Sequence, residues 1–222
     1  WVQFMLLAWI LGFSALGSIG AVAGAGLLLA FPDMVRRSLV PYLVSYASGT
    51  LLGAAFLGMI PSGIQAAPTR DIMLAVLCGL VLFFILEKLV IWRHCHKQDC
   101  EVHGQAAPLI LIGDAFHNFV DGIVIAAAFL TAVPLGITAA IAVIAHEIPQ
   151  EVGDFAILLD GGYSRGRALL LNSLSAAATL PGAILAYFWL AKAAAMMPFV
   201  LALSASSFIY IAAADLIPGL HK

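Results

Sequence analysis

The chain has 222 residues, of which 63% are hydrophobic and only 10% are charged, and its mean hydropathy is +1.06. A soluble domain is about 45–50% apolar and about 25% charged, so this composition excludes an ordinary water-soluble protein. The formal net charge of −2 indicates no particular partner, and three scattered cysteines do not form a disulfide framework. Because the sequence opens at Trp1 within an apolar run, we expect a partial chain rather than one that starts with a signal peptide.

Apolar runs recur along the chain, and their length of about 20 residues is what a hydrocarbon core selects. Lipid cannot satisfy free backbone groups, and the alternation needed for a β-barrel is missing, so these runs predict helices. We expect an all-α membrane protein, a polytopic transmembrane helix bundle that forms a single domain over residues 1–222. The predicted spans are residues 4–30, 40–60, 72–92, 106–130, 135–159, 168–191 and 193–217.

Small residues are dense in the first span and recur in the second. Such residues allow helix backbones to approach closely within a membrane. The pattern therefore predicts close helix packing at Gly12, Gly17, Gly20, Gly24, Gly26, Gly49 and Gly53.

Lysine and arginine are unequally distributed between the two sets of connecting loops, and cytoplasmic loops carry an excess of these residues. If the N-terminus is outside, only Arg70 and Lys192 fall in outer loops. The inner set is then Arg36, Arg37, Lys88, Arg93, Lys97, Arg165, Arg167 and Lys222. We therefore expect an external N-terminus and a cytoplasmic loop at residues 93–105.

Ionisable and amide side chains gather in the fourth and fifth spans, although such groups are costly inside a membrane. At about 100° per residue, the polar residues of each span cover one helical face. The short turn at Val133-Pro134 makes the two helices antiparallel neighbours whose polar faces can meet. The residues are Asp114, His117, Asn118 and Asp121 in the fourth span, and His146, Glu147, Gln150, Glu151 and Asp154 in the fifth.

These side chains are typical ligands of divalent transition metals. Imidazole and carboxylate groups suit Zn²⁺, Fe²⁺ and Mn²⁺, and His117 and Asp121 have the i, i+4 spacing that converges on one ion. The donors are too many for one tetrahedral site, which indicates two adjacent ions. No Lys or Arg lies in either cluster, so cations or protons must balance the carboxylates. The alternative is a purely structural network of hydrogen bonds between the two helices.

Two motifs carry a resemblance to a known family: HNFVDG at residues 117–122 and HEIPQE at residues 146–151. Together they resemble the paired signature of the ZIP (Zrt/Irt-like) divalent metal transporters. The likeness extends to residues 113–115, 152–156 and 215–218, to Ser48-Gly49 and to the break at Pro61. It implies a ZIP-type domain of eight helices, of which this sequence carries seven. It also implies a binuclear metal centre between the fourth and fifth helices and movement of Zn²⁺, and also Fe²⁺, Mn²⁺ or Cd²⁺, into the cytoplasm.

The resemblance also assigns roles to individual positions. The first metal site would comprise His117, Asp121, His146 and Gln150, and the second would draw on Asn118, Glu147 and Glu151. Asp114 and Asp154 would line the metal route. Two positions depart from the family pattern: Gln150 stands where many relatives carry His or Glu, and Ser175 offers a hydroxyl near where some carry a carboxylate.

The loop after the third span holds five further metal-ligand candidates: His94, Cys95, His96, Cys100 and His103. ZIP relatives often have a His-rich loop at this place. The spacing does not match a structural zinc motif, and a reducing cytosol keeps thiols free. The loop is therefore either a metal-receiving or sensing segment or a solvated linker.

Two other functions compete with transport. An intramembrane zinc metalloprotease is suggested by His146-Glu147, which begins like HExxH, but Gln150 replaces the second His and Pro149 disrupts the helix. A non-transporting metal sensor is the second alternative. We expect no enzyme activity and no catalytic cofactor, with Zn²⁺ or a similar ion bound as substrate. The expected partners are divalent metal ions and the lipid bilayer, with a homodimer left open and no nucleic acid; the expected location is a bacterial inner (plasma) membrane.

Overall fold

A computed structural model describes residues 2–94, 106–190 and 192–220, and every regular element in these ranges is helical. The elements in chain order are α1 (Val2–Ala30), α2 (Asp33–Gly53), η1 (Ala54–Met59), α3 (Ile60–Ala66), α4 (Thr69–His94), α5 (Ala106–Thr131), α6 (Val133–Asp160), α7 (Arg165–Ala176), α8 (Thr179–Leu190), η2 (Ala194–Met196), α9 (Met197–Tyr210), η3 (Ile211–Leu216) and α10 (Ile217–Gly219). η1 and η3 are π-helical turns, and η2 is a 3₁₀ turn.

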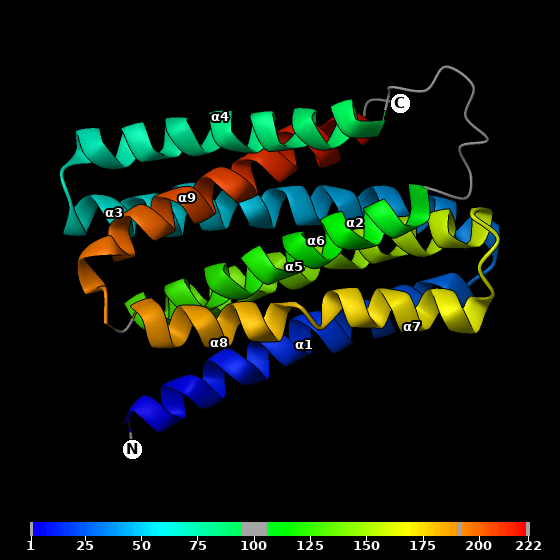
Figure 1. The fold of residues 1–222 in the computed structure, drawn as a ribbon, viewed down its shortest axis with the longest axis horizontal. Coiled ribbons are helices and arrows are strands. Elements are labelled where there is room, and N and C mark those ends of the chain that lie inside the picture. The colour runs from blue at the N-terminus through cyan, green and yellow to red at the C-terminus, as the bar shows by residue number, and fades with distance from the viewer. Residues whose placement is uncertain (1, 95–105, 191, 221–222) are drawn as a thin grey trace.

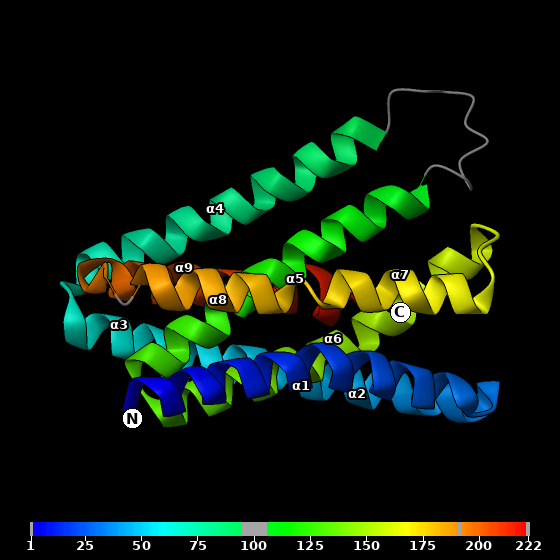
Figure 2. The same ribbon diagram turned by 60° about the horizontal axis from the view of Figure 1, so that its bottom comes forward.

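Seven spans within the described residues are long and apolar enough to cross a membrane, which confirms the predicted helix bundle. The long helices run along one axis, and the two chain ends lie at opposite ends of the bundle (Figures 1 and 2). Large apolar side chains cover the outer surface; Phe4 is 74% exposed and Leu57 is 83% exposed. Lipid is the solvent that such a surface requires, so the chain is an integral membrane protein.

The second span is longer than the sequence suggested. Its predicted end was residue 60, because Pro61 was interpreted as a break, but the span runs from Arg37 to Ala66. Pro61 lies in the first turn of α3, directly after the π-helical turn η1. Proline is tolerated there because the first-turn N–H groups of a helix need no intrahelical acceptor.

The sixth span is divided into two helices. The sequence predicted one helix over residues 168–191, whereas α7 ends at Ala176 and α8 begins at Thr179. Pro181 has no N–H to donate to the carbonyl of Ala177, so a continuous α-helix is broken here. The break places Thr179 in the interior of the bundle, where it is 1% exposed.

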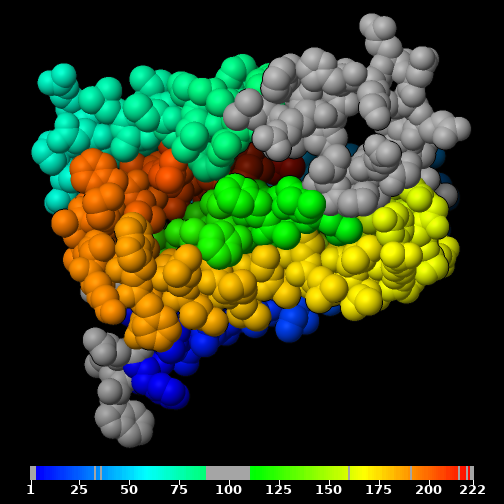
Figure 3. All heavy atoms as spheres, viewed as in Figure 1, coloured from blue at the N-terminus to red at the C-terminus, as the bar shows by residue number. Residues whose placement is uncertain are grey.

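α5 occupies the centre of the bundle and packs against α1, α6, α8 and α9. Its backbone touches that of α8: a Cβ atom at Gly122 would lie 2.0 Å from the Thr179 carbonyl oxygen, and one at Gly182 would lie 2.1 Å from the Phe119 carbonyl oxygen. Only glycine fits at such a contact. On the face drawn in Figure 3, α5 emerges between α4 and the α7–α8 span.

The glycines predicted to mediate close packing behave differently from one another. Gly24 is tightly packed, since a Cβ there would lie 3.2 Å from Ile148 of α6. The prediction is wrong for four others, where a Cβ would meet no atom within 4 Å. These open positions are Gly12, Gly26, Gly49 and Gly53.

Candidate metal centre

The polar faces of α5 and α6 meet inside the bundle. A single residue, Ala132, separates the two helices, so they form an antiparallel pair. His117 on α5 and His146 on α6 approach within 3.1 Å at their Nε2 atoms. His146 is buried and His117 retains 21% side-chain exposure, which opens one side of the contact to the adjoining cavity.

Four side chains, which we call the mixed cluster, surround this contact: His117, Asp121, His146 and Glu147. His117 Nε2 lies 3.6 Å from Asp121 Oδ2 and 3.3 Å from Glu147 Oε1. His146 Nε2 lies 3.2 Å from the same Asp121 oxygen and 3.3 Å from the same Glu147 oxygen. A tetrahedral Zn²⁺ site with bonds of about 2.0–2.1 Å separates its donor atoms by about 3.3 Å. The distances around the two Nε2 atoms therefore match those of such a site.

The ring of His146 is held in the orientation that a metal ligand needs. Its Nδ1 lies 3.0 Å from the carbonyl oxygen of Ala142. That oxygen can only accept a hydrogen bond, so Nδ1 carries the proton and the Nε2 lone pair of the neutral ring is left for the cluster. Metal-binding histidines generally donate their second ring N–H in this way.

A second group, which we call the carboxylate cluster, adjoins the first: Asp114, Glu147 and Glu151. Each residue offers an oxygen within 4.8 Å of the other two, and all three are buried. Glu147 belongs to both clusters. Oxygen-only ligands favour harder divalent cations than imidazole does. The two clusters thus share one carboxylate but differ in ligand character.

Most carboxylate oxygens of the two clusters lack a hydrogen-bond partner among the described residues. Among the described residues, both oxygens of Asp121, Glu147 and Glu151 have no hydrogen-bond partner, and no Lys or Arg pairs with them. An unpaired buried charge costs several kcal/mol. Bound cations or protons must therefore accompany this arrangement.

The two amide residues of the motifs contact Asp114. Asn118 Nδ2 donates to Asp114 Oδ1 at 3.1 Å, and Gln150 Nε2 donates to the same oxygen at 3.0 Å. The resemblance placed Gln150 with His117, Asp121 and His146. In the structure Glu147 lies with these three residues, and Gln150 donates its amide to the neighbouring carboxylate; a role of Gln150 as a ligand stays a prediction.

A cavity of about 910 Å³ leads away from the two clusters. Asp114 and His117 on α5, together with Gln150 and Asp154 on α6, contribute its polar lining. Its other walls come from α2, η3 and the segment that ends at Leu220. Asp154, predicted to line the metal route, therefore shares this space with members of both clusters.

The remaining predicted site residues contribute differently. Ser175 is buried and donates its hydroxyl to the carbonyl oxygen of Leu111 at 3.1 Å, so it ties α7 to α5, and its place on the metal route stays a prediction. The candidates in the loop after α4 are His94, Cys95, His96, Cys100 and His103. His94 is the last residue of α4, but its side chain is not described, and the other four lie outside the described residues.

Two residues that support the site were missed in the sequence. Thr179 Oγ1 donates to Asn118 Oδ1 at 3.1 Å and shares its proton with the Ala176 carbonyl oxygen at 2.8 Å. Asn172 Nδ2 donates to the Glu151 carbonyl oxygen at 3.1 Å. The available signal was Pro181, which breaks the sixth span and brings Thr179 to Asn118.

Comparison with known proteins identifies the family. The family model described as "ZIP Zinc transporter" matches residues 92–222, more than half of the chain and all of the residues of both clusters. The chain belongs to the ZIP zinc transporter family. The resemblance carried by the HNFVDG and HEIPQE motifs is thereby confirmed.

Three ZIP relatives illustrate the extent of the similarity. Zinc transporter zipt-7.2 of Caenorhabditis elegans is 31% identical over 280 residues, covering 96% of this chain and 60% of the relative. Zinc transporter ZIP5 of Homo sapiens is 30% identical, covering 84% of this chain and 48% of the relative. Metal cation symporter ZIP14 of Mus musculus is 40% identical, covering 54% of this chain and 24% of the relative. The chain thus spans 60% or less of each.

All three ZIP relatives are named as transporters or symporters, which agrees with the expectation that the chain is not an enzyme. They come from animals. A bacterial membrane, a homodimer and the extent of one ZIP-type domain over residues 1–222 stay predictions.

Proposed function

We propose that this chain binds divalent transition-metal ions, Zn²⁺ foremost, between α5 and α6 and moves them across the membrane. The observation that carries the proposal is the mixed cluster, whose two Nε2 atoms lie 3.1 Å apart and 3.2–3.6 Å from the oxygens of Asp121 and Glu147. Two imidazoles and two carboxylates at this spacing suit Zn²⁺, and Fe²⁺, Mn²⁺ and Cd²⁺ accept similar ligands. Membership of the ZIP zinc transporter family supports the same ion class.

The proposed centre is binuclear. Glu147 offers oxygens to both clusters, and the carboxylate cluster adds Asp114 and Glu151. One shared carboxylate can bridge two cations and reduce the repulsion between them. The unpaired buried oxygens of the carboxylate cluster support a second cation there.

The proposed direction is into the cytoplasm. The excess of Lys and Arg in one set of loops supports an external N-terminus, which places the end of α6 and the cavity's outer wall at Leu220 on the cytoplasmic side. A metal ion would leave the mixed cluster past Asp114 and then Asp154. Carboxylates along the route give the ion successive weak partners, and release requires ligands that hold it only moderately.

The experiment is zinc flux into proteoliposomes that contain the full chain, measured with ⁶⁵Zn²⁺. The proposal predicts saturable flux that His146→Ala abolishes. Thr138→Ala is the matched control, because Thr138 lies on the same helix, is exposed and donates its hydroxyl to the Pro134 carbonyl oxygen of its own helix. Metal binding without flux would contradict transport and favour a sensor, and cleavage of a membrane-embedded peptide would favour a protease.

A further inference from the structure

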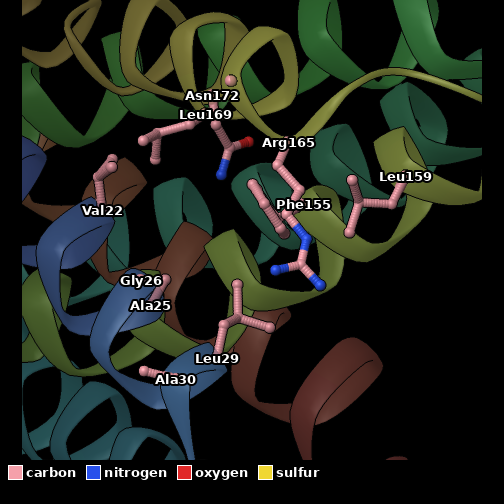
Figure 4. A pocket seen from close by; sticks show the side chains of 11 residues that line it. Val22, Ala25, Gly26, Leu29, Ala30, Phe155, Leu159, Arg165, Leu169 and Asn172 are labelled. Carbon is pink, nitrogen blue, oxygen red and sulfur yellow. The ribbon is translucent and has the colours of Figure 1, made fainter.

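A second cavity lies at one end of the bundle, between α1, α6 and α7 (Figure 4). Its volume is about 410 Å³, within the range of about 300–1,000 Å³ that ligand pockets occupy. The walls are mainly apolar, with Val22 and Leu29 on α1, Phe155 on α6 and Leu169 on α7. No residue of the two metal clusters lines it. It is therefore separate from the proposed metal route.

Arg165 is exposed and is the one charged residue in the lining, and Figure 4 shows its guanidinium extending into the pocket. Among the described side chains, no carboxylate pairs with it. Arg167, two residues later, lies over the ring of Tyr163 at 5.1 Å and does not line the cavity. Arg165 is thus the guanidinium available to a bound anion, and guanidinium groups bind phosphate strongly.

The depth of the cavity matches the boundary between headgroups and acyl chains. Ala30 ends α1, Leu159 is next to the last residue of α6, and Arg165 begins α7. The first-turn N–H groups of a helix lack intrahelical acceptors, so the start of α7 adds to the attraction for an anion. Basic pockets between transmembrane helices at this depth bind anionic lipid headgroups.

Two features suit the part of a lipid below its phosphate. A Cβ at Gly26 would meet no atom within 4 Å, so α1 leaves space for a chain beside Leu29. At the inner end, Asn172 is buried and its Oδ1 has no hydrogen-bond partner among the described residues. That oxygen can accept from a hydroxyl or a water bound with the ligand, so the cavity combines apolar walls with two polar positions.

We propose that this pocket binds one anionic phospholipid, with its phosphate at Arg165 and an acyl chain against Gly26, Leu29 and Leu169. The charge of the Arg165 guanidinium selects the anionic headgroup, and the apolar walls select a lipid over a free anion. The lining and the metal clusters have no residue in common, and Asn172 connects the two sites through its hydrogen bond to the Glu151 carbonyl oxygen.

Native mass spectrometry of the full chain in detergent tests this proposal, with dioleoyl-phosphatidylglycerol, dioleoyl-phosphatidylcholine and inorganic phosphate as separate probes. Phosphatidylglycerol should bind one molecule about fivefold or more tightly than phosphatidylcholine. Arg165→Gln should remove that preference, Arg165→Lys should retain part of it, and Arg167→Gln should change it less than twofold.

A second variant tests the apolar part of the site without touching the charge. Gly26→Leu fills the open space and should weaken retention of both lipids. Gly12→Leu is the matched control, because Gly12 is an equally open glycine on α1 that lines a different, purely apolar cavity. The proposal is overturned if the two lipids bind equally, or if Arg167→Gln loses the preference for phosphatidylglycerol as fully as Arg165→Gln does. It is also overturned if Gly26→Leu has no effect on lipid retention, or if inorganic phosphate displaces phosphatidylglycerol.

Discussion

The Nε2 atoms of His117 and His146 face each other across 3.1 Å, at the meeting point of α5 and α6. His146 already uses Nδ1 to donate to the Ala142 carbonyl oxygen. Its Nε2 in the neutral ring therefore presents a lone pair toward His117. A cation bound at the proposed site would satisfy both nitrogens at once, together with the adjacent oxygens of Asp121 and Glu147.

The first prediction concerns zinc affinity. His117→Ala and His146→Ala each remove one of the four donors. Loss of a residue that only hydrogen-bonds a metal ligand typically weakens binding about 10–100-fold, so loss of a ligand itself should weaken Zn²⁺ binding by at least that much. Competition against a fluorescent zinc chelator measures this in detergent. Thr138→Ala should bind as the unchanged chain does. A less than threefold loss in both histidine variants would contradict the assignment of the mixed cluster.

The second prediction concerns the number of ions. Because Glu147 belongs to both clusters, Glu147→Gln should reduce occupancy of both, whereas Asp121→Asn should affect the mixed cluster alone and Glu151→Gln the carboxylate cluster alone. Elemental analysis of metal bound per chain after equilibrium dialysis distinguishes these cases. If Glu147→Gln lost one ion and kept the other at full affinity, Glu147 would not be shared.

The third prediction concerns the hydrogen bond between Thr179 and Asn118. Thr179→Val keeps the side-chain shape but leaves Asn118 Oδ1 without its donor. The expected loss of stability is about 1 kcal/mol, or a fall of about 2–4 °C in Tm. Thr138→Val is the matched control at an exposed position and should leave Tm within about 1 °C. Equal shifts in the two variants would argue against the buried bond.

The fourth prediction concerns the contact between α5 and α8. Gly122→Ala places a methyl group against the Thr179 carbonyl oxygen and should destabilise the fold by about 1–3 kcal/mol or more. Gly113→Ala, on the same helix with no atom within 4 Å of the new Cβ, should be neutral or stabilising by up to about 1 kcal/mol. Thermal unfolding in detergent measures both, and a neutral Gly122→Ala would show that the two backbones are not in contact.

Much of the architecture could be predicted because a membrane imposes strong local constraints. The length of each apolar run identified the seven spans, and the one-face distribution of polar residues on α5 and α6 predicted that their faces meet. The helix breaks were harder to predict, since proline has opposite effects at different positions. Pro61 was interpreted as a break but lies in a tolerated first-turn position, whereas Pro181 was overlooked and divides a span.

The detailed composition of the site could not be obtained from helical periodicity. Periodicity gives the direction of each side chain about its own axis, but the grouping of Glu147 with the histidines and of Gln150 with Asp114 depends on how α5 and α6 are placed against each other. The contact of Gly122 with the Thr179 carbonyl oxygen could not be predicted from periodicity either. Open and tightly packed glycines, such as Gly26 and Gly122, look alike in one sequence.

The backbone contact between α5 and α8 also limits how the protein can change shape. No side chain lies between Gly122 and the Thr179 carbonyl oxygen, so neither helix can slide or rotate against the other without a clash. Asp121 is the residue before Gly122, and Thr179 holds Asn118 from the α8 side. α5 and α8 therefore have the mechanical character of one rigid body, and a switch of access between the two sides of the membrane requires other helices to move relative to this pair.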